Sequence, residues 1–190
     1  MRGRAAGALM LALALGAVPR GARRLLADEP TLGVQVNRAV ERGVEWLRKR
    51  QHPDGSFEGP YAREFPAGQA ALAAYALAKS LVPADDPAIQ RAVAFVRSRP
   101  IVKTYEAAAA ILALDALKDP AQDEWIRGAA RWLEGHVDAK EGVWSYPFGA
   151  TRDHYKTDLS NTQFAALGLW VAEAHGYHAA HTSSERRHAG

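Results

Sequence analysis

The sequence predicts an all-α protein, and two observations carry that prediction. The chain has 39 alanines and 18 leucines against 16 valines and isoleucines together, a balance that favours helices over strands. Its apolar side chains also recur at spacings of three and four residues between residues 34 and 176. With 190 residues, 48% of them apolar, the chain is long enough for one soluble domain. We therefore assign residues 34–176 to a single helical domain.

Three segments of this domain have the pattern of amphipathic helices, with apolar residues on one face and charged residues on the other. An aromatic residue stands at the same place in each segment and is followed by an aliphatic one. The aligned aromatic residues are Trp46, Phe95 and Trp132. This alignment indicates an internal repeat in which each amphipathic segment forms an outer helix.

Each amphipathic segment is followed by one that is apolar on nearly every side. These inner segments span residues 67–78, 107–117 and 164–174. A helix without a polar face must be covered all round, so we expect the inner helices to lie in the interior. Asp158 and Ser160, before the third inner segment, are suited to cap its free N–H groups. The domain thus reads as about three pairs of outer and inner helices.

The N-terminal region, residues 1–27, resembles a signal peptide or an N-terminal anchor. It has five arginines and no acidic residue, and it contains a short uncharged run, 5–18, rich in alanine and leucine. Removing it leaves 19 of the 24 basic residues against 21 acidic ones. The pI of about 9.3 therefore belongs to the whole chain, and a nucleic-acid partner is not expected. We predict export, with membrane attachment only where this region is uncleaved.

The C-terminal residues 177–190 are polar and rich in histidine, and they lack an apolar stripe. We predict a disordered tail there. The spacing of these histidines is irregular, and the chain has no cysteine. No metal and no cofactor are therefore predicted.

A turn motif closes the first outer helix. Gln51 is followed by the turn pair Asp54-Gly55 and by Phe57, which is placed to pack back on the helix. We expect the Gln51 side chain to bond the free carbonyls at the end of its own helix. A second motif, residues 142–145, keeps an aromatic residue but has Val137 at the position of the glutamine.

These motifs resemble the glutamine-to-tryptophan repeats of the squalene-hopene cyclase and protein prenyltransferase superfamily. The resemblance covers residues 34–176 and implies an α/α toroid, in which inner and outer helices form two concentric rings. Such toroids have five to seven helix pairs, so three pairs imply an incomplete ring. The open arc would leave an apolar flank at each end. The resemblance therefore implies a truncated toroid, one part of an oligomer, or a module that a partner caps.

The catalytic motifs of these relatives are not found here. The cyclases protonate an alkene with an Asp-x-Asp-Asp motif, which this sequence lacks. The prenyltransferases hold zinc through Asp, Cys and His, and this chain has no cysteine. The nearest acidic pair, Asp85-Asp86, stands before Pro87 at the start of an outer helix, where carboxylates favour the helix dipole.

The densest polar cluster, residues 151–161, leads into the third inner helix. Within it, His154 and Asp158 are candidate catalytic residues, because imidazole and carboxylate groups can transfer protons. The candidate ligand-binding residues are Tyr155 and Asn161 from the same cluster, and Tyr105 and Glu106 from the entry to the second inner helix. Capping by Asp158 and Asn161 is the structural alternative.

Two functions are compatible with this sequence. The first is an exported, non-catalytic binding or scaffold module with an unknown ligand or protein partner, or with a second copy in a homo-oligomer. The second is an enzyme of the terpene-cyclase kind (an isomerase) or of the polysaccharide-lyase kind, with a cavity completed by another chain. The sequence favours the first, because an arc of three helix pairs cannot enclose a water-free cavity by itself.

Overall fold

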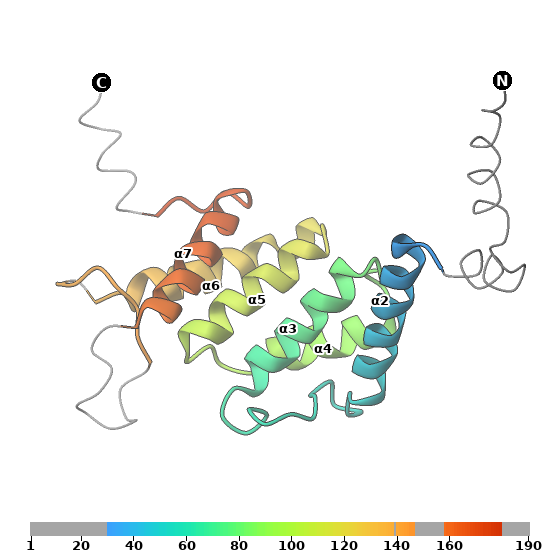
Figure 1. The fold of residues 1–190 in the computed structure, drawn as a ribbon. Helices are drawn as coiled ribbons and strands as arrows, with labels where there is room; N and C mark the ends of the chain where they lie inside the picture. Colours follow the sequence, from blue (N-terminus) through green and yellow to red (C-terminus); the bar gives the residue numbers. More distant parts are fainter. Residues whose placement is uncertain (1–29, 139, 147–157, 180–190) are drawn as a thin grey trace, which may run out of the picture. The chain divides into compact units, whose positions relative to one another are not determined.

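The structure is a computed structural model that describes residues 30–138, 140–146 and 158–179. These residues are helical and contain no strand, which confirms the all-α class (Figure 1). The α-helices are α2 (Leu32–Lys49), α3 (Pro66–Lys79), α4 (Pro87–Arg97), α5 (Thr104–Ala116), α6 (Asp123–Gly135) and α7 (Leu159–Glu173); the short 3-10 helix η1 is Pro120–Gln122. The predicted leader 1–27 lies outside the described residues, as do all but 177–179 of the predicted tail.

The chain divides into two compact units, residues 1–41 and 42–190, and the boundary falls inside α2. The described part of the first unit, residues 30–41, is the beginning of that helix. The remaining helices all belong to the second unit, where Val44 and Leu47 of α2 pack, partly buried, against the core.

Proline and aspartate set where several helices begin. Asp86 caps α4 by accepting a 2.8 Å hydrogen bond from Ala88 N–H, and Pro87 follows it at the first helical position. Asp158 caps α7 in the same way through a 2.7 Å bond from Asn161 N–H. The third apolar helix therefore begins at Leu159, five residues before the predicted segment. Ser160 lies in its first turn and is not the cap, because the Asp158 side chain already meets the free N–H groups.

The apolar helices pack beside one another, α3 on α5 and α5 on α7. The amphipathic helix α4 packs on α3, while α6 packs on both α5 and α7. Small residues let the backbones approach closely: a Cβ placed on Gly168 of α7 would lie 3.2 Å from Ala108 Cα of α5. Among the described helices, α4 and α6 thus pack most on the apolar helix that precedes each of them in the chain, and α4 with α5 is not among the main helix contacts.

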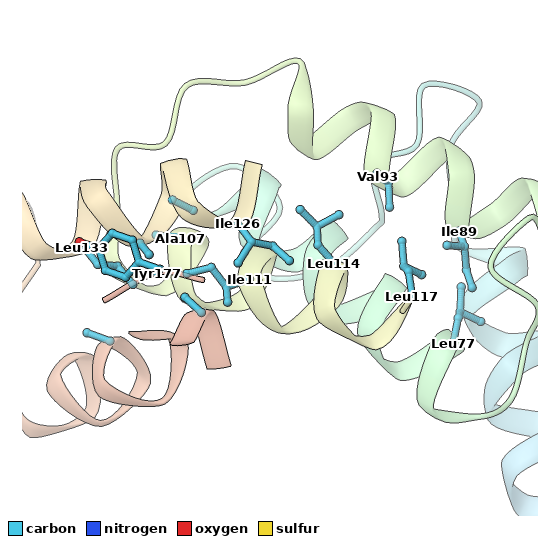
Figure 2. Close-up of a cluster of buried hydrophobic side chains, with 14 of the residues drawn as sticks. Leu77, Ile89, Val93, Ala107, Ile111, Leu114, Leu117, Ile126, Leu133 and Tyr177 are labelled. Atoms are coloured by element: carbon cyan, nitrogen blue, oxygen red, sulfur yellow. The ribbon is translucent and has the colours of Figure 1, made fainter. Parts of the chain in front are cut away.

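The core consists of two clusters of buried apolar side chains. The first joins α3, α4, α5, α6 and α7, and its largest fully buried members include Leu77, Ile111 and Leu133 (Figure 2). The second is formed mainly by alanines of α3 and α5 together with Phe57 and Phe95. Tyr177, the first residue of the predicted tail, is buried in the first cluster, so the packed region includes it.

The turn after α2 is fixed to α4. The Gln51 amide donates a 2.8 Å hydrogen bond to the carbonyl of Ala88 and accepts another, also 2.8 Å, from Arg91. Our expectation that Gln51 would bond the carbonyls of its own helix was therefore wrong. The chain reverses at Gly55 (φ +91°), and its backbone pairs Gln51 with Phe57. The Gln51 side chain lies beside the first turn of α4 instead.

Candidate functional site

The N-terminal ends of the three apolar helices lie together and are connected by aromatic rings. Phe65, the residue before α3, has its ring centroid 6.4 Å from that of Tyr146. Tyr105 of α5 lies 6.0 Å from Tyr146 and 4.9 Å from Phe164 of α7. Offset and edge contacts at these distances stabilise such clusters. We call Phe65, Tyr105, Tyr146, Phe164, Asp158 and Asn161 the N-end cluster.

Asp158 and Asn161 form the polar part of the N-end cluster. The Asp158 carboxylate accepts hydrogen bonds from Ser160 Oγ at 2.5 Å and from Asn161 N–H at 2.7 Å. Burial alone would raise the pKa of Asp158, but these hydrogen bonds outweigh it, and the pKa lies below its ordinary value. The side chain of Asn161 is fully buried, and its Nδ2 has no hydrogen-bond partner at bonding distance.

Tyr146 connects the aromatic and polar parts of this cluster. Burial raises the pKa of its phenol, and the neighbouring Tyr105 and Asp158 raise it further. The hydroxyl therefore stays protonated over the physiological range. The cluster thus presents phenol, carboxylate and amide groups in a largely aromatic setting.

Glu106 follows Tyr105 in the sequence but faces a different neighbour. Its side chain is 4% exposed and packs against Gly68, where an added Cβ would lie 3.2 Å from Glu106 Cγ. Burial raises the pKa of Glu106, partly offset by the charge of Lys103 and by hydrogen bonds from the N–H groups of Gly68 and Ala67. Phe65, the residue before α3, provides no side-chain cap. The Glu106 carboxylate, which belongs to α5, instead accepts hydrogen bonds from the free N–H groups at the start of α3.

The structure brings together three of the residues predicted for the site. Tyr105, Asp158 and Asn161 meet in the N-end cluster, whereas Glu106 lies beside it, against α3. His154 and Tyr155 lie outside the described residues. Tyr146, Phe65 and Phe164 were not predicted from the sequence. Phe65 and Phe164 are aromatic residues near the start of an apolar helix, whereas Tyr146 lies in the segment between α6 and α7 and has no such signal. Only the fold shows that these residues meet.

A second polar cluster, also missed, lies at the other end of the apolar helices. His175, just after α7, has Nδ1 2.8 Å from an Asp123 carboxylate oxygen and Nε2 3.1 Å from one of Asp115. Burial raises the pKa of Asp115, but hydrogen bonds from Lys118 and His175 lower it more, so the net shift is downward. Arg127 also donates a 2.9 Å bond to the carbonyl of His175. These contacts fix the end of α7 to α5 and α6.

These contacts define the chemistry available at the two ends. In the described ranges, no group of three or more His, Asp or Glu side chains is arranged to hold a metal ion. Both nitrogens of His175 already contact carboxylates, which leaves neither free for a substrate. The catalytic and ligand-binding roles stay predictions, while the capping by Asp158 is shown directly.

The outward face of α7 is an exposed apolar surface. Trp170 is 69% exposed and Leu167 is 39% exposed, although both belong to a helix with almost no charge. A hollow of about 550 Å³ lies beside Trp170, between α7 and the end of α5, and Asp115, Glu173 and His178 contribute its polar lining. We call Ala166, Leu167, Trp170 and Ala174 the α7 face.

Comparisons with protein-family models, curated proteins and solved structures find no match to this chain. The α-helical class therefore rests on the described helices, and the resemblance to cyclases and prenyltransferases stays a prediction. None of these described helices is long and apolar enough to span a membrane.

Proposed function

We propose that this chain is an exported, non-catalytic binding module of the α/α-toroid type that docks on another polypeptide through the α7 face. One observation carries the proposal. The buried residues of α7 are Asn161, Ala165, Gly168 and Ala172, which are small or polar, while Leu167 and Trp170 face outward. Burial of large apolar side chains stabilises a fold most, so a helix that turns them outward is suited to a partner.

The packing of the other apolar helices supports the same proposal. α5 contacts α3 on one side and α7 on the other, and α6 covers it further. α7 has α5 and α6 as its main neighbours among the described helices, and its Leu167 and Trp170 stay exposed. A further apolar helix from another polypeptide would complete the same arrangement.

The state of Asp158 favours binding over catalysis at the N-end cluster. Its carboxylate is occupied by two hydrogen bonds at the start of α7, and its lowered pKa keeps it ionised at neutral pH. Such a group holds no proton to donate, and its Oδ1 atom already accepts both of these hydrogen bonds at the start of the helix. The cyclase-like or lyase-like enzyme, with a cavity completed by another chain, remains the alternative.

Size-exclusion chromatography with light scattering tests the proposal on the purified chain and on Trp170→Glu. We expect the unmodified chain to self-associate as its concentration rises, because the α7 face is apolar and uncovered. Trp170→Glu should remain monomeric, because a carboxylate on that face resists desolvation.

Tyr61→Glu is the matched control, since Tyr61 is 64% exposed but lies in the segment between α2 and α3. It should associate like the unmodified chain. Monomers of all three proteins at every concentration, or equal association of all three, would contradict a docking role for α7.

A further inference from the structure

The turn after α2 packs on one face of α4, at Ala88, Arg91 and Ala92, and we call these three residues the α4 turn site. At Gly55 the backbone approaches so closely that an added Cβ would lie 2.1 Å from the carbonyl oxygen of Arg91. The Gln51 side-chain amide donates a hydrogen bond to the Ala88 carbonyl at the same site. Phe57 is 4% exposed and belongs to one buried cluster with Ala92 and Phe95. One face of α4 is thus covered by a glycine, an amide and an aromatic ring.

The same positions on α6 carry no such turn. We align the two helices by placing Phe95 of α4 on Trp132 of α6. The residues of the α4 turn site, Ala88, Arg91 and Ala92, then correspond to Trp125, Gly128 and Ala129. These α6 residues line a groove of about 560 Å³, together with Trp132 and with residues of the connection after α4. That connection, residues 98–103, is short and contributes no glycine or aromatic side chain to cover the groove.

The floor of this groove is open at its centre. Within the described part of the chain, the nearest atom to a Cβ built on Gly128 is Nη2 of Arg131, at 3.7 Å. On α4, by contrast, the backbone of the turn fills the corresponding space, and a Cβ on Gly55 would lie 2.1 Å from the carbonyl oxygen of Arg91. Trp125 and Trp132 remain half-buried at the groove, whereas Phe95 at the corresponding place on α4 is buried.

The charges around the groove favour an acidic occupant. Arg97 and Arg99 line it and are exposed, and neither makes an ion pair at salt-bridge distance with another described residue. The acidic lining residue, Glu124, is already paired with Arg127 at 3.0 Å and with Arg131 at 2.8 Å. Arg97 donates a 2.6 Å hydrogen bond to Gln122, and the Arg99 guanidinium lies 4.3 Å over the Phe95 ring. These contacts hold the two arginines at the groove, and their other N–H groups can meet a carboxylate on an incoming chain.

We propose that the α6 groove binds a turn of another polypeptide of the same kind as residues 51–58 of this chain. Its features are a glycine that lies against Gly128, an aromatic side chain that packs between Trp125 and Trp132, and acidic side chains that face Arg97 and Arg99. The groove is a different surface from the α7 face, so either proposal can fail while the other stands.

A synthetic ring-closed peptide, Gln-His-Pro-Asp-Gly-Ser-Phe-Glu, is the probe, because it copies residues 51–58 and holds the turn before binding. Binding to the full chain is followed by NMR through the indole N–H signals of Trp125 and Trp132. We expect saturable shifts of both signals. Replacing the peptide's phenylalanine with alanine should weaken binding about tenfold or more, since it removes a buried aromatic side chain. High salt should also weaken binding.

Gly128→Leu fills the groove, and Gly135→Leu is its control on the same helix, where an added Cβ meets no atom within 4 Å. Peptide binding should be lost with Gly128→Leu and retained with Gly135→Leu. The proposal is overturned by the absence of saturable shifts in the unmodified chain, or by equal binding of the alanine peptide. The peptide comparison decides even where Gly128→Leu unfolds. Equal binding by a folded Gly128→Leu protein would also overturn the proposal.

Discussion

Helices α5 and α7 are alike in sequence and differ in their surroundings. Each is nearly free of charge and has apolar residues on every side. Ten of the thirteen residues of α5 are buried, against four of the fifteen in α7. The difference arises because α5 lies between two neighbours of its own kind, whereas the outer side of α7 has no described neighbour. An apolar sequence therefore predicts that a helix is buried, but only the fold shows how much of its surface the neighbouring helices cover.

The identity of the buried residues sharpens this comparison. α5 buries Ile111, Leu112 and Leu114 as well as its alanines. α7 buries small residues, and Gly168 lies against Ala108 and Leu133. Close backbone contact at Gly168 thus holds α7 in place, together with the partly buried Leu169 and Val171. This arrangement leaves Leu167 and Trp170 available to another surface.

The largest expected effect is the difference between alanine substitutions in the two helices. Ile111→Ala should lower the free energy of unfolding by about 2–5 kcal/mol, because it opens a cavity at a fully buried position. Leu167→Ala should change it by less than about 1 kcal/mol, since that side chain is 39% exposed and leaves no closed cavity. Urea denaturation of both variants at a low protein concentration measures the difference. Similar losses in the two variants would show that α7 is as buried as α5 in solution.

Overpacking at Gly168 should have the next largest effect. A Cβ at this position lies 3.2 Å from Ala108 Cα and 3.3 Å from Leu133 Cδ1, so a valine forces α7 away from α5. We expect Gly168→Val to lower stability by about 1–3 kcal/mol. The control is Gly128→Val on α6, where the nearest atom to the new Cβ is the end of a flexible arginine at 3.7 Å. A thermal midpoint for Gly168→Val equal to that of the control would remove the close-contact explanation for α7.

The positions of the helices could be predicted from the sequence, but the exposure of α7 could not. Apolar periodicity is a local signal, so it identified each helix and its amphipathic or apolar kind. For α7 the pattern has no polar face and therefore does not say which side meets a neighbour. The hydrogen bonds of the Gln51 side chain could not be predicted either, because its partners Ala88 and Arg91 lie about forty residues further along the chain.

The candidate site was predictable to the same extent. Asp158, Asn161 and Tyr105 stand at the starts of apolar segments, and that position is readable from the sequence. Their contact with Tyr146 depends on the parallel packing of α5 and α7. The cluster around His175 joins residues more than fifty positions apart, and no spacing in the sequence indicates it.

The starts of α5 and α7 form a second contrast, between two carboxylates. Asp158 caps its own helix and has a lowered pKa, whereas Glu106 is buried against α3 and has a raised one. A raised pKa in the folded state means that folding disfavours the charged form. Ionised Glu106 therefore costs stability above its unfolded pKa of about 4.5, and this cost disappears as the pH falls below that value.

Glu106→Gln tests this contrast and is the smallest of the expected effects. Glutamine keeps an oxygen that accepts from the N–H groups of Ala67 and Gly68 but carries no charge to desolvate. The variant should be more stable than the unmodified chain at neutral pH, and the two should converge below about pH 4.5. Urea denaturation across this range measures the gap, with Glu173→Gln as the control on an exposed side chain. A less stable Glu106→Gln at neutral pH would instead show that the negative charge at the start of α3 outweighs the cost of burying it.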